Sequence, residues 1–436
     1  MTRNIRINEG RNLKVLIVSH NVISETNNMG KTLLSYFKAF NPEEVAEFYI
    51  QDKLPKNASV ASSYFRITDR EALKSVLGKK PGNEYCLTNS IPEGNDELKG
   101  AVESIRQYGR KKNALVYTIR NAVWSLAHWK TKELISWLKK VNPDVIFFMA
   151  GDYSFIYRIA LDFKKILNKP LVVCCVDDYY LFNRNENSLL GRAQFNSYIR
   201  IVHRLMEESS FILTISDSMG LAYSELFNKD CRTLHTSAKK RECAHDTKRT
   251  KVGYFGNLSF GRNKQLTEMG KAIKGLEIPG INGIDVYSGE KNPEILKDMT
   301  EENGIYFHGE ITAMGVAAKM DECIAVIHTE SFDSKIRNIV RYSVSTKIAD
   351  SLLNGPCLIA YGPDDVASID YLKRNGAAYV INEPNRLKER LCEILTKADL
   401  RDQIVARARE LAANNHDETV NPKKVREWLE EVVAIY

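Results

Sequence analysis

Short apolar runs recur along the whole chain, separated by polar or amphipathic stretches. The runs are located at residues 13–18, 145–149, 171–176 and 211–215 in the first half of the chain, and at 252–255, 284–287, 305–307, 323–327, 357–360 and 378–381 in the second. Continuous apolar strands with helical patterns between them are typical of parallel sheets that helices cover on both faces. The pattern predicts an α/β protein in which strands and helices alternate.

A polar stretch, residues 236–251, is rich in lysine and arginine, and a new strand with a glycine turn begins directly after it. A chain of 436 residues corresponds to two or three domains at roughly 150 residues each. We therefore predict two doubly wound, Rossmann-like domains, residues 1–245 and 246–415, followed by a final segment, residues 416–436. Ligands of such sheets bind beyond the carboxyl ends of the strands, so residues that directly follow strands are the first candidates for a site.

The charge balance excludes some partners. Lysine and arginine outnumber aspartate and glutamate by 62 to 55, a net charge of +7, which is too modest to indicate a nucleic-acid partner. No run approaches the roughly 18 apolar residues of a membrane-spanning helix, and residues 1–13 lack the apolar segment of a secretory signal. These features predict a cytoplasmic protein.

Several standard phosphate and metal motifs are missing. Residues 29–32 end like a P-loop, but Glu25 stands where that motif requires its first glycine. No Gly-x-Gly-x-x-Gly follows a strand, and there is no Asp-x-Asp or His-x-x-x-His pair. The sequence therefore predicts no bound metal and no cofactor.

One segment that could hold an anion is residues 253–264, where a strand leads into a glycine-bearing turn. Gly256 would let backbone N–H groups approach a phosphate, with Asn257 beside it. Arg262 and Lys264 follow and would supply charge-assisted contacts. The alternative is an ordinary strand-to-helix turn with solvated cations.

A second such segment is residues 341–356. Ser345 and Thr346 are good N-cap residues for a helix that begins at Lys347, so hydroxyls, an ammonium group and helix N–H groups would converge there. Asp350, one turn later, could accept hydrogen bonds from ribose hydroxyls. The alternative is a capped surface helix with a modest Lys347–Asp350 pair.

These segments together resemble the glycosyltransferases of the GT-B fold, especially family 4 (glycosyl transferases group 1). That family has an Arg and a Lys that grip the donor diphosphate. Asn257 takes the place of the usual Arg, and Arg262 falls at the usual Lys position. The family also has two glutamates, to which Tyr342 and Asp350 correspond, the latter followed five positions later by Gly355.

The resemblance covers nearly the whole chain and implies two domains that face a central cleft. Residues 14–34, which include Gly30, look like the first strand, acceptor-side loop and helix of the family, and residues 211–222 look like its Ile-Ser motif. The last helix, residues 421–436, is placed like the segment that crosses back to the first domain. The donor implied is a nucleoside-diphosphate sugar, and the acceptor is a glycan or a lipid-linked molecule.

Such a reaction requires cations or helix N-termini that stabilise the departing diphosphate, and we assign this work to Arg262, Lys264 and Lys347. The resemblance implies retention of anomeric configuration. An inverting enzyme would instead need a side-chain base, for which Asp152, Asp177 and Asp178 are candidates because each follows a strand. His20 closes the first strand and is an acceptor-side candidate, although a lone histidine is usually structural.

Residues 106–140 form a basic aromatic arm, with nine cations, one acid and three tryptophans, Trp124, Trp129 and Trp137. Basic residues mixed with tryptophan suit an anionic membrane surface or a lipid diphosphate. The alternative is a domain helix whose apolar stripe, Leu115, Ile119, Val123 and Leu126, lies in the core while its basic face is solvated.

The sequence thus predicts a metal-independent glycosyltransferase of cell-surface polysaccharide synthesis, with the inner face of the cytoplasmic membrane as one candidate location. A non-catalytic nucleotide-sugar or glycan-binding protein on the same scaffold is an alternative, because the first family glutamate is missing. A nucleotide-sugar epimerase of the GT-B fold is another, and it would need acids and bases on both faces of the sugar.

Overall fold

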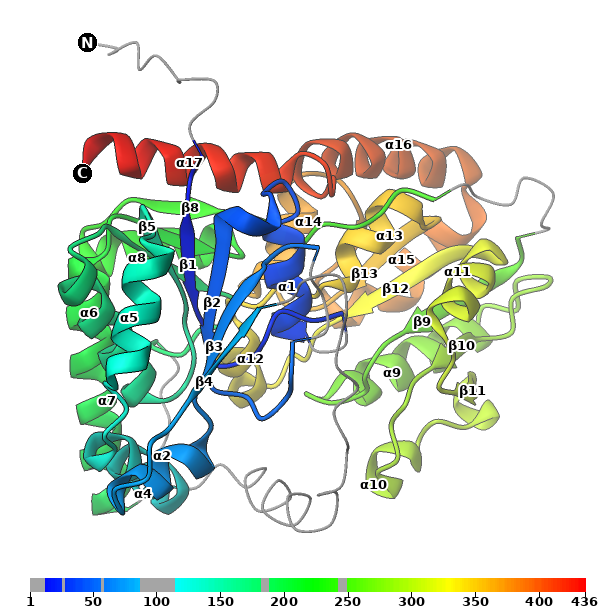
Figure 1. Ribbon diagram of the computed structural model, residues 1–436. Helices are drawn as coiled ribbons and strands as arrows, with labels where there is room; N and C mark the ends of the chain where they lie inside the picture. The colour runs from blue at the N-terminus through cyan, green and yellow to red at the C-terminus, as the bar shows by residue number, and fades with distance from the viewer. Residues whose placement is uncertain (1–11, 26–27, 56–58, 87–113, 182–187, 242–248) are drawn as a thin grey trace. The chain divides into compact units, whose positions relative to one another are not determined.

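The computed structural model describes residues 12–25, 28–55, 59–86, 114–181, 188–241 and 249–436. The chain forms two compact units (Figure 1). Unit 1 takes in Met1–Thr214, Gly220–Arg232 and Pro422–Tyr436, and unit 2 takes in Ile215–Met219 and Thr233–Asn421. The main part of unit 2 thus runs from Thr233 to Asn421, where the sequence predicted residues 246–415, and the last segment, Pro422–Tyr436, belongs to unit 1.

Unit 1 is built on an eight-stranded sheet with the order β4-β3-β2-β1-β5-β6-β7-β8. Neighbouring strands from β3 to β7 pair in parallel, and β4 pairs antiparallel with β3 at the edge. The strands are β1 (Val15–Val18), β2 (Val45–Tyr49), β3 (Ser63–Arg66), β4 (Asn83–Cys86), β5 (Val145–Met149), β6 (Leu171–Cys175), β7 (Ile212–Thr214) and β8 (Cys231–Thr233). The central strands β1, β5 and β6 are buried along their whole length, as expected for a sheet covered on both faces.

The helices that accompany this sheet are α1 (Asn28–Tyr36), α2 (Asp69–Val76), α4 (Ala114–Leu126), α5 (Lys132–Val141), α6 (Ser154–Leu167), α7 (Leu189–Glu208), α8 (Asp217–Phe227) and α17 (Asn421–Ile435), with a 3-10 turn η1 (Pro42–Glu44). A capping box fixes the start of α2: the Glu71 N–H donates to the Thr68 hydroxyl, and the Thr68 N–H donates to the Glu71 carboxylate. α17 is held to unit 1 by Arg426, which donates to both Glu44 carboxylate oxygens at 2.8 and 2.9 Å.

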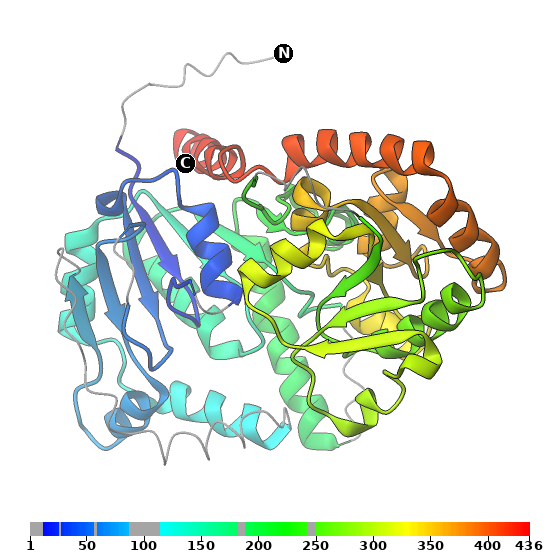
Figure 2. The ribbon, with the colours of Figure 1, turned by 90° about the vertical axis from the view of Figure 1, so that its right-hand side faces the viewer.

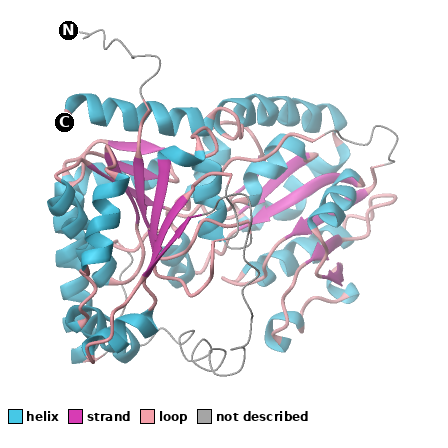
Figure 3. Cartoon of the chain, in the orientation of Figure 1, coloured by secondary structure: helices cyan, strands magenta, loops and turns pink. Residues whose placement is uncertain are grey.

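Unit 2 is built on a six-stranded, wholly parallel sheet with the order β11-β10-β9-β12-β13-β14 (Figures 2 and 3). Its strands are β9 (Lys251–Phe255), β10 (Ile284–Tyr287), β11 (Ile305–Gly309), β12 (Cys323–Thr329), β13 (Cys357–Tyr361) and β14 (Tyr379–Ile381). Its helices are α9 (Arg262–Lys274), α10 (Pro293–Leu296), α11 (Ala313–Asp321), α12 (Ser334–Val340), α13 (Lys347–Asn354), α14 (Ala367–Arg374), α15 (Leu387–Thr396) and α16 (Ala398–Asn415), with 3-10 turns η2 (Glu301–Asn303) and η3 (Pro384–Arg386). Apolar clusters fill both faces of the sheet.

The ten strands predicted from apolar runs are all present. The pattern missed β2, β3, β4 and β8. β2 carries Glu47 at its centre, which interrupts the apolar run although the side chain is fully buried. β4 is an exposed edge strand with a polar sequence, so its backbone pairing is not reflected in hydrophobicity.

None of the described helices combines the length and the apolar character that crossing a membrane requires.

Candidate functional site

In unit 2, the turn between β9 and α9 has an unusual backbone. Phe260 and Gly261 both adopt left-handed φ values, 58° and 74°. A Cβ atom at Gly261 would lie 2.9 Å from the Ser331 hydroxyl oxygen, so glycine is required there for space as well as for conformation. The Tyr254 hydroxyl, from β9, donates to the Asn257 carbonyl oxygen at 2.5 Å and holds the start of the turn. The turn thereby fixes where Arg262, the first residue of α9, projects.

Arg262 points into the protein and is held on several sides. Its guanidinium donates to both carboxylate oxygens of Glu330, at 2.9 and 3.1 Å, and to the Asn257 side-chain oxygen at 2.7 Å. Glu330 directly follows β12 and its side chain is only 3% exposed. Burial raises the pKa of Glu330 against the opposing charges of Arg262 and Lys347. Nη2 contacts Glu330, Nη1 contacts Asn257 and Nε contacts the Thr329 carbonyl oxygen, so all three nitrogens are engaged and the guanidinium is fixed in one orientation.

Lys347, the first residue of α13, brings a second cation to the same turn. A Cβ atom at Gly256 would lie 2.9 Å from the Lys347 Nζ, so the ammonium group lies directly over this glycine. Burial and the charge of Arg262 lower the pKa of Lys347. Thr346 occupies the N-cap position, but its side chain makes no capping hydrogen bond, so the predicted capping by a hydroxyl is not seen there.

His328, at the end of β12, completes this group but adds no charge. Burial and the nearby charges of Arg262 and Lys347 lower its pKa to about 3, so it is neutral near pH 7. Its Nε2 lies 3.0 Å from the Ser368 hydroxyl. We call Arg262, His328, Glu330 and Lys347 the unit 2 cationic cluster. Two cations face one carboxylate beside Gly256, which has no side chain, an arrangement that suits an anionic ligand.

Two residues predicted to act here are not in the cluster. Lys264 lies in the first turn of α9 and, like Lys347, is exposed to solvent. The described contacts place the Lys347 Nζ over Gly256 and Arg262 on Glu330, and they include none from Lys264 to either residue. Burial raises the pKa of Asp350, and the opposing charge is that of Arg241 instead of Lys347 or Arg262. Asn354, one turn after Asp350, likewise accepts from the Arg241 backbone N–H. The guanidinium of Arg241 itself is bound by Asp321.

Unit 1 gathers a different set of side chains at the ends of β1, β3 and β5. His20 follows β1, Asp69 begins α2 after β3, and Asp152 and Tyr153 follow β5, while α4 supplies Tyr117 and Arg120. We call these six residues the unit 1 aromatic cluster. Two of its members, His20 and Asp152, were predicted from the sequence.

Contacts within this cluster pair one of its two carboxylates with a cation and the other with a hydroxyl group. Arg120 donates to the Asp69 carboxylate at 3.0 Å, and its Cζ lies 4.0 Å from the centroid of the Tyr153 ring. Tyr117 donates its hydroxyl proton to Asp152 at 2.6 Å. The His20 ring stacks on Tyr153, with centroids 6.0 Å apart.

His20 is uncharged near neutral pH. Burial and the adjacent Arg120 guanidinium lower its pKa to about 4, although Asp69 and Asp152 act in the opposite direction. A neutral imidazole can both donate and accept hydrogen bonds, and a carboxylate and aromatic faces lie beside it. This chemistry suits a neutral, hydroxyl-bearing ligand better than an anion.

The remaining predicted residues of unit 1 have local roles. The Asp178 carboxylate accepts from the Tyr180 and Leu181 N–H groups and from the Tyr223 hydroxyl, so it holds the loop after β6. Asp177 is exposed and accepts from the Tyr179 hydroxyl at 3.4 Å. A Cβ atom at Gly30 would lie 2.6 Å from the Val22 carbonyl oxygen, so Gly30 allows α1 to pack tightly against the loop after β1.

Glu47, a residue that the sequence analysis missed, contacts the loop that follows β1. Its carboxyl group is fully buried in β2, where one oxygen accepts from the Ile23 N–H at 3.0 Å and the other lies 2.9 Å from the Ser19 hydroxyl. Burial raises the pKa of Glu47 to about 8. The Ser19 hydroxyl has one proton and also donates to the Asn21 carbonyl, so a protonated Glu47 that donates to Ser19 satisfies every group.

The basic aromatic arm, residues 106–140, differs from both interpretations. Residues 106–113 lie outside the described residues, and the rest forms α4 and α5. All three tryptophans are buried, so the prediction that they meet a membrane surface is wrong: Trp124 stacks on Phe155, and Trp137 packs on Phe65. Large aromatic rings gain more from burial in the core. The predicted core stripe is also wrong, because Leu115, Ile119 and Leu126 are exposed and only Val123 is half-buried.

No trio of His, Cys, Asp or Glu side chains in the described ranges is grouped closely enough to hold a metal ion.

A scan against family models and a search of curated proteins give no match. Solved structures do match. HepE of Anabaena, crystallised with UDP, has a TM-score of 0.62 and 12% identity, with 96% of this chain and 100% of HepE covered. TarM of S. aureus has a TM-score of 0.61 and 11% identity, with 98% and 100% covered. A trehalose-6-phosphate synthase of Burkholderia multivorans has a TM-score of 0.58 and 10% identity, with 97% and 99% covered.

The chain has the GT-B fold. The match extends over nearly the full length of each compared chain and includes both units, so the predicted fold of two Rossmann-like domains is confirmed. Membership of family 4 stays a prediction.

Proposed function

We propose that the protein is a glycosyltransferase that moves a sugar from a nucleoside-diphosphate sugar to a glycan or lipid-linked acceptor, in cytoplasmic steps of cell-surface polysaccharide synthesis. The observation that carries the proposal is the unit 2 cationic cluster, in which Arg262 and Lys347 converge on the Gly256 turn. Two cations beside an open backbone turn suit a diphosphate. HepE, which has the same fold, has been crystallised with UDP and with UDP-glucose, which supports this choice of donor.

In the proposed reaction, negative charge develops on the diphosphate as its bond to the sugar breaks. Arg262 and Lys347 would stabilise that charge without a metal ion, and the Glu330 pair holds Arg262 in place beforehand. A preorganised charge costs no reorganisation at the moment of reaction. We no longer assign a role to Lys264, because the described contacts place Lys347, and not Lys264, beside Gly256.

We assign the acceptor to the unit 1 aromatic cluster, where His20 and Asp152 would hydrogen-bond its hydroxyl groups. Following the family resemblance, we propose retention of configuration, with the leaving phosphate taking the acceptor proton. The anomeric configuration of the product, measured by NMR, tests this step. An inverted product would overturn retention and would make Asp152 the leading candidate for a general base.

A non-catalytic sugar-nucleotide-binding protein is the second candidate, because Tyr342 stands at the first acidic position of the family. Any turnover excludes this candidate. Consumption of an acceptor separates the transferase from an epimerase, which converts the donor alone.

The first experiment is a thermal-shift panel of uridine, guanosine, adenosine, cytidine and thymidine diphosphates. A ligand at 100 times its dissociation constant adds about 2.7 kcal/mol of stability, which raises Tm by a few degrees. We expect one diphosphate to stabilise the wild type and Lys264→Ala, the matched lysine outside the cluster, but not Lys347→Ala. If no diphosphate stabilises the wild type, the donor assignment falls.

A further inference from the structure

Helix α4 is oriented against the usual rule for a helix on a protein surface. Its polar and aromatic side chains point into unit 1: Tyr117 donates to Asp152, Arg120 to Asp69, and the Trp124 indole N–H to Asp69 at 2.7 Å. Its aliphatic side chains point outward. Leu115, Ile119 and Leu126 are 55%, 54% and 64% exposed.

These outward residues form one stripe. Leu115, Ile119, Ala122 and Leu126 follow one another at intervals of four, three and four residues, which places them on one side of a helix, and Ala122 is also exposed. Surface helices normally turn such a stripe toward the core. On α4 the side chains that build the unit 1 aromatic cluster occupy the side that faces the core. The aliphatic stripe therefore lies on the protein surface.

Helix α2 extends the apolar surface. α2 packs against α4, and the two lie side by side in Figures 1 and 2. Leu73 is 54% exposed and Leu77 is 81% exposed. We call Leu73, Leu77, Leu115, Ile119 and Leu126 the leucine face. Exposed aliphatic side chains gathered on two helices that pack together are typical of an interaction site.

The charges beside the leucine face indicate what covers it. Arg70, Lys74 and Lys79 are exposed on and just after α2, interspersed with Leu73 and Leu77. The nearby acids are engaged: Asp69 pairs with Arg120, and Glu71 caps α2. Between residues 114 and 132 the sequence contains no acid. An apolar stripe bordered by cations is complementary to a bilayer that contains anionic lipids.

We propose that the leucine face docks unit 1 onto an anionic lipid bilayer, with α4 lying in the plane of the interface. The unit 1 aromatic cluster lies on the opposite side of this helix, about one helix diameter, ~10 Å, from the bilayer. Resting on the proposed function, this position specifies the acceptor as a lipid-linked one whose head group reaches His20 and Asp152. The tryptophans, which the sequence pointed to, have no part in this contact.

The test is co-sedimentation of the full chain with vesicles of phosphatidylcholine alone and of phosphatidylcholine with phosphatidylglycerol. We expect binding to the anionic vesicles that weakens at high salt. Ile119→Gln combined with Leu126→Gln should reduce the partition coefficient at least about tenfold, because two aliphatic side chains no longer enter the bilayer. Leu221→Gln is the matched control, since Leu221 on α8 is 66% exposed but lies outside the leucine face.

Absence of binding by the wild type at low salt, or equal binding by the double variant, would overturn the proposal. A dimer of the wild type in size-exclusion chromatography that the double variant abolishes would also overturn it, because a second copy would then cover the face. Circular dichroism and the thermal unfolding of each variant show that unit 1 is folded, and diphosphate binding, measured on the same samples, shows that unit 2 is intact. Diphosphate binding also separates the two proposals. Loss of vesicle binding with diphosphate binding retained would overturn the membrane contact alone, and absence of diphosphate binding with vesicle binding retained would overturn the donor assignment alone.

Discussion

Both units collect charged side chains at the carboxyl ends of their strands, yet the two clusters have opposite electrostatic character. In the unit 2 cationic cluster, two cations face one carboxylate, and the histidine is neutral. In the unit 1 aromatic cluster, Arg120 is paired with Asp69, His20 is neutral, and two tyrosine rings lie beside them. Related sheets thus present two cations and one carboxylate in unit 2, and one cation, two carboxylates and aromatic rings in unit 1.

The difference shows that the fold fixes where a ligand can bind, while a few side chains fix which ligand it is. Arg262 and Arg120 each form an ion pair with a carboxylate next to a histidine whose pKa is lowered. Lys347 adds a charge without a counterpart in unit 1, where Tyr153 stacks on the guanidinium instead. Each prediction below changes one side of this comparison.

The largest effect is expected from the cations of unit 2. Arg262→Ala or Lys347→Ala should lower the transfer rate about 10²- to 10³-fold, because each removes a preorganised charge from the leaving group. Steady-state kinetics at saturating donor measures this loss. Arg262→Ala also leaves Glu330 buried without its partner, so Arg262→Lys, which keeps a cation, is the accompanying variant. Normal rates in both Lys347→Ala and Arg262→Lys would remove the cluster from the reaction.

A smaller and more selective effect is expected in unit 1. His20→Ala and Asp152→Asn should each reduce kcat/KM for the acceptor about 10- to 100-fold, the cost of a lost buried hydrogen bond of about 1.5–3 kcal/mol. The dissociation constant of the donor diphosphate should not change. Asp177→Asn, at an exposed carboxylate on a neighbouring loop, is the control. A change in donor affinity alone would mean that the two clusters have been assigned the wrong way round.

The third prediction concerns pH and Glu47. Its pKa is raised from 4.5 to about 8 in the folded protein, so the folded state binds more protons than the unfolded state between these values. Its contribution to stability is therefore complete at acid pH and is lost as the pH rises through 8. Relative to Glu47→Gln, which mimics the protonated carboxyl group, the wild type should lose about 2 kcal/mol between pH 6 and pH 8. Urea unfolding of both proteins at each pH gives this difference, and parallel pH dependences would contradict a protonated Glu47.

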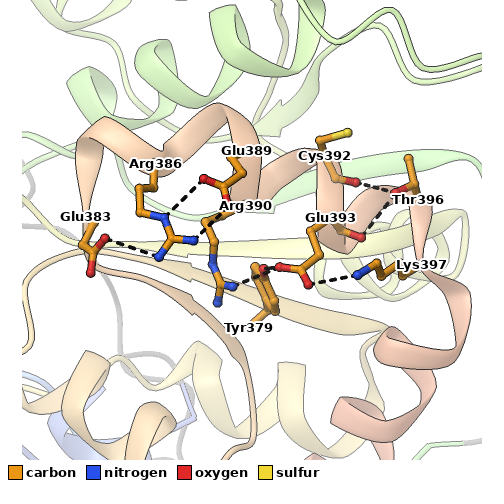
Figure 4. Close-up of polar contacts among 9 residues, drawn as sticks. All are labelled: Tyr379, Glu383, Arg386, Glu389, Arg390, Cys392, Glu393, Thr396 and Lys397. Atoms are coloured by element: carbon orange, nitrogen blue, oxygen red, sulfur yellow. Dashed lines mark hydrogen bonds and ion pairs between the residues drawn. The ribbon is translucent and has the colours of Figure 1, made fainter.

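The smallest effect is expected in the partly exposed ion-pair network of α15, which belongs to neither cluster (Figure 4). There Glu393 accepts from Tyr379, Arg390 and Lys397, with Arg386 pairing to Glu389 nearby. Glu393→Gln should lower the free energy of unfolding by less than about 1 kcal/mol, because exposed pairs are screened by water and salt. The difference should shrink in 1 M salt, and activity should be unaffected. A loss of several kcal/mol in the free energy of unfolding would contradict this prediction.

The sequence predicted the fold better than it predicted the sites. Apolar strands and the Gly256 turn are local patterns, so β9, α9 and α13 were found where expected. Arg262 and Lys264 look equivalent in sequence, but helix geometry turns one toward Glu330 and the other to solvent. Glu330 itself was missed because its importance arises only from burial beside Arg262.

The orientation of α4 could not be predicted from the sequence either. Its spacing correctly indicated an amphipathic helix, but periodicity does not say which side faces the core. The hydrogen bonds of Arg120 and Trp124 to Asp69, a residue 51 and 55 positions earlier, determine that orientation. Glu47 was missed for a similar reason, since its partners Ser19 and Ile23 belong to another strand and loop.

The return of α17 to unit 1 has a consequence for how the chain is made. The Arg426–Glu44 and Trp428–Phe211 contacts join the last helix to segments synthesised far earlier. At about 5–20 residues per second, the ribosome needs on the order of ten seconds or more to pass from Arg232 to Pro422. During that interval unit 2 can complete its sheet, whereas unit 1 must wait with the α17 binding surface uncovered. A chaperone would therefore be most useful during this interval, when it could cover the exposed α17 binding surface of unit 1.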